Sequence, residues 1–64
     1  MGVMSKVSWA TIYEDFLGRF PRLRKCMTRF EPFNYLQIKV LNEDDSIILI
    51  YDYWTKKCEI VKHT

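Results

Sequence analysis

Two groups of carboxylates are the first side chains in this sequence that could do chemistry. Glu14 and Asp15 are adjacent, and adjacent side chains on a helix point about 100° apart, so these two do not converge on one atom. Glu43, Asp44 and Asp45 gather in a turn, but they lack the alternating ligands and the later glutamate of a calcium loop. Both groups therefore predict solvated carboxylates and no metal site.

One histidine and two cysteines complete the candidates for chemistry. His63 stands second from the end of the sequence, where a general base would lack a supported ring. Cys26, Cys58 and His63 are too few and too far apart for a zinc site. Two cysteines do not make a disulfide framework, so we expect reduced thiols and a cytoplasmic protein. We expect no enzyme, no cofactor and no metal.

The densest charge lies in a basic segment, residues 19–29, which contains five cations and no acid. Cations beside aromatic rings suit nucleic acids, because the charges neutralise phosphates and the rings stack on bases. The same charges suit an acidic protein surface, and a solvated loop is the third explanation. The candidate contact residues of the basic segment are Arg19, Arg22, Arg24, Lys25 and Arg29.

An amphipathic helix precedes these cations. Its apolar residues recur at steps of 3, 1, 3, 1 and 3 from Trp9 to Phe20, which is the spacing of one helical face. Ser8 is the expected N-cap, with Ser5 as the alternative. Pro21 disfavours helical backbone at Phe20, so the helix is predicted at about 9–19. A basic connector, 20–33, follows it, and we expect one short helical turn there and then a loop.

The period changes to two after the connector, which predicts strands at about 34–41, 46–53 and 57–62. A register with Val40 opposite Ile47 and Tyr53 opposite Cys58 places the large apolar residues of all three strands on one face. That face would hold Leu36, Ile38, Val40, Ile47, Leu49, Tyr51, Cys58 and Ile60. We therefore predict one α+β domain over 1–64, an α-β-β-β fold in which the N-terminal helix packs on a three-stranded antiparallel meander. Residues 1–7 are expected to be flexible.

The second face of the sheet is the other candidate for binding. One helix covers only one side of a sheet, and a strand that is apolar on both faces is expected where both faces are covered. Scattered surface isoleucines are the plain explanation; a homodimer and a different macromolecule are the alternatives. The candidate contact residues on this uncovered face are Tyr35, Lys39, Ile48, Ile50, Trp54 and Val61.

Four pieces of the chain, SWATIYEDF, RFPRL, EPFNYLQIKV and LIYDYWTKK, together resemble small proteins of phages and mobile elements of Gram-positive bacteria. The matching motifs are structural: Trp9, Arg19-Phe20-Pro21 and Tyr51-Asp52-Tyr53. The resemblance implies a protein that binds a host protein, for example an immunity nuclease, and blocks or redirects it. We therefore expect a non-enzymatic binding protein with a host partner and no membrane span. The alternative is a nucleic-acid-binding accessory protein that uses the basic segment.

Overall fold

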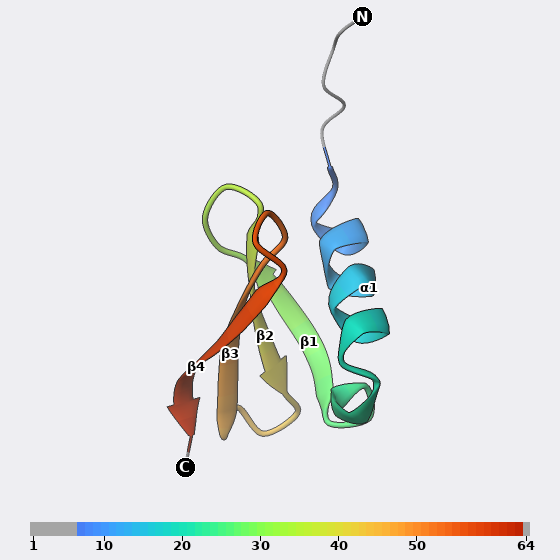
Figure 1. Ribbon diagram of the computed structural model, residues 1–64. Coiled ribbons are helices and arrows are strands. Elements are labelled where there is room, and N and C mark those ends of the chain that lie inside the picture. Colours follow the sequence, from blue (N-terminus) through green and yellow to red (C-terminus); the bar gives the residue numbers. More distant parts are fainter. Residues whose placement is uncertain (1–6, 64) are drawn as a thin grey trace, which may run out of the picture.

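The structure, a computed structural model, describes residues 7–63 as one helix beside a four-stranded antiparallel sheet (Figure 1). The elements are α1 (Trp9–Arg19), the 3-10 turn η1 (Pro21–Leu23), β1 (Met27–Pro32), β2 (Gln37–Asn42), β3 (Ile47–Asp52) and β4 (Lys57–His63). The strands lie in chain order, so the sheet is a meander. The α+β class is confirmed, but the predicted number of strands is wrong. The expected flexible start lies, apart from Val7, outside the described residues.

Residues next to the helix fix both ends of α1. The Ser8 hydroxyl oxygen accepts a hydrogen bond from the Thr11 amide at 3.1 Å, which satisfies a free donor of the first turn. Phe20 leaves helical backbone with φ −124°, as expected of a residue before proline. Pro21 then opens η1, the short helical turn expected there. No helix among residues 7–63 is long and apolar enough to cross a membrane.

β1 corrects the prediction that residues 20–33 form a connector. It pairs antiparallel with β2, and its register shifts between Met27 and Arg29. This bulge brings Met27 and Phe30 to the same side of the sheet although they are three residues apart, because one extra residue lies between them. A spacing of three imitates a helix, which is why the alternation of this strand is hidden in the sequence. Pro32 is tolerated because β1 is an edge strand.

Both hairpin registers are offset by two residues from the prediction. Val40 lies opposite Leu49 instead of Ile47, and Cys58 lies opposite Tyr51 instead of Tyr53. The turns take up the difference, since four residues lie between β2 and β3 and four between β3 and β4. A shift of two keeps side chains on their predicted faces, because the strand period is two. The faces of β2 and β3 were therefore predicted correctly although the partners were not. In β4 the register shifts again between Ile48 and Leu49, so Lys62 joins the uncovered face, on which Val61 was predicted, and Val61 falls at the bulge.

The core lies between α1 and one face of the sheet. Seven buried residues form it: Ile12, Phe16, Met27, Ile38, Val40, Leu49 and Tyr51. Phe16 meets Tyr51 edge-on with ring centroids 5.4 Å apart, and the Tyr13 hydroxyl donates to the carbonyl of Met27 at 2.6 Å. These contacts place the stripe of the helix from Ile12 to Phe20 against the core, as its spacing predicted. Trp9, the first residue of the predicted stripe, is 37% exposed, so the prediction was wrong at that position.

The helix covers only part of the face on which it lies. α1 packs mainly against β1 and β2, and β4 forms the edge of the sheet that is farther from the helix (Figure 1). Ile60 lies opposite Leu49 as part of this face, yet 63% of it is exposed. The prediction that Ile60 would be buried is therefore wrong, because β4 extends beyond the reach of a single helix.

Candidate functional site

The basic segment is divided by ion pairs. Arg19 donates to Asp15 within α1 at 3.0 Å, and Arg29 on β1 pairs with Asp45 of the β2–β3 turn. The other three cations, Arg22, Arg24 and Lys25, lie in η1 and the turn that follows, exposed and without an ion pair to any residue of 7–63. The five predicted contact residues therefore do not form one continuous basic surface.

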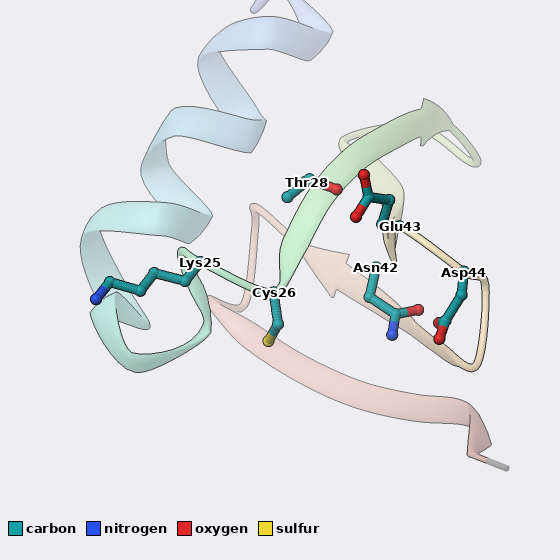
Figure 2. Close-up of a pocket in the computed structure, with 6 residues that line it drawn as sticks. All are labelled: Lys25, Cys26, Thr28, Asn42, Glu43 and Asp44. Carbon is teal, nitrogen blue, oxygen red and sulfur yellow. The ribbon is translucent and has the colours of Figure 1, made fainter.

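An acidic turn lies across a hollow from Lys25, one of these three cations. A hollow of about 480 Å³ has Lys25, Cys26 and Thr28 on one side and Asn42, Glu43 and Asp44 on the other (Figure 2). Hydrogen bonds from the side chain and backbone of Ser46 lower the pKa of Asp44, which favours its charged form. The field at this end of the molecule is therefore mixed in sign, whereas a nucleic acid attracts proteins by a stripe of positive charge.

The middle of the uncovered face is less apolar than its sequence indicates. Ile48 and Ile50 are half-buried, and charged residues flank them in the ladder, since Lys39 and Glu59 lie on either side of Ile50. Leu41, on the same face, is only 5% exposed. Val61 is exposed and falls where the β3–β4 register shifts. This face is therefore a mixed surface with small apolar parts.

The most exposed rings lie together at one end of the sheet. Tyr35 is 80% exposed, Trp54 is 79% exposed and Phe33 is 48% exposed. They come from the β1–β2 loop and the β3–β4 turn, which lie at the same end of the molecule (Figure 1). The Tyr53 amide donates to the Leu36 carbonyl at 2.8 Å and joins these two segments. We call Phe33, Tyr35 and Trp54 the aromatic tip.

Hydrogen bonds to one carboxylate hold the turn that carries Trp54. Asp52 accepts from the amides of Trp54 at 2.8 Å and Thr55 at 3.2 Å, and its other oxygen accepts from the side chain of Gln37 at 2.9 Å. The bond from Gln37 is the main reason that the pKa of Asp52 is lowered. Asp52 therefore stays charged at neutral pH and keeps the turn ordered.

The β1–β2 loop and the β3–β4 turn each end on a residue with left-handed backbone. Leu36 has φ 57° and Lys56 has φ 61°, a conformation that costs a non-glycine residue on the order of 1 kcal/mol and persists only where the surroundings fix it. Lys56 is fixed on two sides, because its ammonium lies 3.4 Å from the centroid of the Tyr53 ring and 3.5 Å from the carboxylate of Asp15. The aromatic tip is therefore presented by ordered turns tied to the helix.

The buried hydroxyl nearest this region joins the sheet to the helix. The Tyr51 hydroxyl donates to Asp15, and burial together with this bond raises the pKa of Tyr51 far from neutrality. Burial alone would raise the pKa of Asp15, but bonds from Tyr51 and Arg19 outweigh it and the pKa is lowered. Among residues 7–63, no three metal-binding side chains converge. Binding through rings and charges is what this arrangement supports.

Sequence reasoning found two of the three rings of the aromatic tip. Tyr35 and Trp54 were predicted contact residues, whereas Phe33 was not. The turn residue Asn34, between Phe33 and Tyr35, could have indicated a loop at this position. In the structure the ammonium of Lys39 lies 5.8 Å from the centroid of the Phe33 ring. The tip and the remaining cations of the basic segment lie at opposite ends of the fold (Figure 1), so the two predicted contact surfaces are not joined.

Neither a protein-family model, nor a curated protein, nor a solved structure matches this chain. The function is therefore proposed from the surface of the molecule and from the resemblance of the sequence.

Proposed function

We propose that this chain is a small protein-binding module whose main contact surface is the aromatic tip. The observation that carries the proposal is the 80% exposure of Tyr35 and the 79% exposure of Trp54 on two segments joined by a hydrogen bond. Tryptophan and tyrosine dominate the binding energy of protein interfaces, because each presents a large rigid ring with a polar edge.

The binding energy that the aromatic tip can provide depends on the area of its rings and on the order of the turns that carry them. A large ring buries about 150–250 Å², so fully covering one ring contributes about 4–6 kcal/mol at 25 cal/mol per Å² before binding costs are subtracted. Ordered turns reduce those costs, because less loop freedom is lost on association. The bonds to Asp52 and the Tyr53–Leu36 bond supply that order. The two rings would therefore be the centre of a larger contact, since a specific interface buries about 1,000 Å² or more.

The partner that we propose is a host protein, in line with the resemblance to small phage proteins. Inhibition or redirection of a nucleic-acid enzyme is the activity that this resemblance implies. Direct binding of nucleic acid is the weaker alternative, because Glu43 and Asp44 lie across the hollow from Lys25 and Arg29 is already paired with Asp45.

The test compares four forms of the immobilised protein in a lysate of a Gram-positive bacterium, with captured proteins quantified by mass spectrometry. The forms are the wild type, a tip variant (Tyr35→Ala with Trp54→Ala), a matched control in the same turn (Thr55→Ala) and a basic variant (Arg22→Ala with Lys25→Ala). We expect a protein captured by the wild type and by Thr55→Ala to be lost from the tip variant. Circular dichroism must show that all four forms are folded.

Two results would contradict the proposal. One is equal capture by the wild type and the tip variant. The other is binding of labelled single- or double-stranded DNA or RNA at about 50 mM salt that the basic variant abolishes and the tip variant retains, since low salt favours phosphate contacts most. That outcome would establish the nucleic-acid alternative.

A further inference from the structure

β4 is an edge strand with an apolar centre and charged flanks. Among residues 7–63, it pairs with β3 on one side and with no strand on the other. Ile60 and Val61 at its middle are 63% and 61% exposed, and Glu59 and Lys62 on either side of them are exposed as well. Long edge strands with exposed apolar residues are templates for pairing with another chain.

A bulge gives this strand an unusual symmetry. Glu59 lies opposite Ile50 and Lys62 lies opposite Ile48. Ile48 and Ile50 are two positions apart and share the uncovered face, so Glu59 and Lys62 share that face too, although they are three residues apart in sequence. The register shift between Ile48 and Leu49 adds the extra residue. The two opposite charges are therefore placed symmetrically about the Ile60–Val61 pair.

We propose that β4 pairs antiparallel with β4 of a second copy of this chain, about a twofold axis through the Ile60–Val61 pair. An axis perpendicular to the sheet keeps each face with itself, so Glu59 of each copy meets Lys62 of the other on the uncovered face. Ile60 and Val61 of both copies meet at the centre, and the two sheets become one. Such a contact is self-complementary, as a twofold interface must be.

Charge and shape on the described surface favour a second copy over another occupant. Neither Glu59 nor Lys62 forms an ion pair with any side chain that the structure describes, so both are available across the axis. Opposite charges on facing strands stabilise the pairing, and like charges oppose it. α1 packs mainly on β1 and β2, which leaves the outer side of β4 open to an incoming strand (Figure 1).

The test is the dissociation constant from sedimentation velocity over a concentration series, for a set of charge variants. Glu59→Lys places lysine opposite Lys62 twice in each dimer, and Lys62→Glu places glutamate opposite Glu59 twice. We expect each single variant to raise the dissociation constant about tenfold, since two pairs change sign, and the double exchange, Glu59→Lys with Lys62→Glu, to restore it. Lys57→Glu is the matched control, because it makes the same charge change on β4 outside the Glu59–Lys62 pairing and should leave the constant unchanged.

Amide hydrogen exchange provides a second measurement that does not depend on any variant. The amides of residues 59–62 should become more protected as the wild-type concentration rises. A wild type that stays monomeric up to about millimolar concentration would overturn the proposal. So would a dimer that both single exchanges leave unchanged, or that the double exchange fails to restore. The tip variant tests the proposed function separately, because Tyr35 and Trp54 lie outside β4 and their replacement should not change dimerisation.

Discussion

Replacing Tyr51 by phenylalanine removes one hydroxyl group and with it the bond that ties β3 to the helix. Tyr51 is fully buried, and its hydroxyl donates to Asp15, which also accepts from Arg19 at 3.0 Å and lies 3.5 Å from the ammonium of Lys56. The ring itself stays in place in the variant, so packing against Phe16 is retained. The substitution therefore isolates the hydrogen bond.

The expected loss is about 1.5 kcal/mol of the free energy of unfolding. A hydrogen bond to a charged group contributes about 1.5–3 kcal/mol, and the lower end applies because the Asp15 side chain is 27% exposed. For a domain of this size the loss corresponds to a fall of about 6–12 °C in Tm. Asp15→Ala should cost more, because it leaves the buried Tyr51 hydroxyl without its partner.

The effect should depend on pH in a defined direction. Burial acts to raise the pKa of Asp15, but the bonds from Tyr51 and Arg19 and the charge of Lys56 lower it on balance. A carboxylate with a lowered pKa in the folded protein stabilises the fold above its unfolded pKa, about 3.9, and this contribution is lost as the pH falls through the folded pKa. The difference between wild type and Tyr51→Phe should therefore be full at pH 7 and shrink below about pH 4.

Urea unfolding followed by circular dichroism, at pH 7 and at pH 3.5, measures both quantities. The variants are Tyr51→Phe, Asp15→Ala and the double variant, which together form a cycle whose coupling energy should be about 1 kcal/mol or more. A Tyr51→Phe variant as stable as the wild type, or strictly additive losses in the double variant, would refute the role assigned to this bond.

Three further predictions concern the helix, the turn and the thiols. Gly18→Ala should raise the free energy of unfolding by about 0.5–1 kcal/mol in thermal or urea unfolding, because a Cβ at this helical position meets nothing within 4 Å; a loss of stability would contradict the open site. Asp52→Ala should cost about 1–2 kcal/mol, since two amide groups of the turn lose their hydrogen-bond acceptor. In a Trp9→Phe background, where Trp54 is the single tryptophan, it should also lower the tryptophan fluorescence anisotropy; unchanged anisotropy would show that the carboxylate does not order the turn. Burial raises the pKa of Cys58, whereas Cys26 is exposed, so a thiol reagent at pH 8 should modify Cys26 first, as peptide mass spectrometry would report; the reverse order would place Cys58 at the surface.

The helix was predictable because its signals are local. The spacing of its apolar residues, the hydroxyl of Ser8 and the ring of Pro21 all act within one or two turns, and α1 spans the expected residues 9–19. The faces of β2 and β3 were predictable for a similar reason, since alternation is a property of each regular strand by itself. Neither signal needs knowledge of which strands meet.

The candidate surfaces were only partly predictable. Trp54 lies in the turn that was predicted between the last two strands, so its exposure could be expected. Tyr35 was predicted inside the strand at 34–41, and this placement was wrong, because β2 begins only at Gln37 and Tyr35 lies in the loop before it. The pairing of Arg29 with Asp45 could not be expected, because the two are 16 residues apart and meet only through the register of β1, β2 and the turn.

By itself the sequence determined an amphipathic helix and the two faces of the regular strands β2 and β3. Only the tertiary structure decided that Met27 begins a fourth strand, since the bulge after it replaces the period of two by a spacing of three. The tertiary structure also decided that Ile60 on β4 is exposed and that Tyr51 and Lys56 both contact Asp15. The physical reason is the same in each case: a residue's periodicity is set by its neighbours in the chain, whereas its burial and its partners are set by segments that reach it only when the sheet closes and the helix packs.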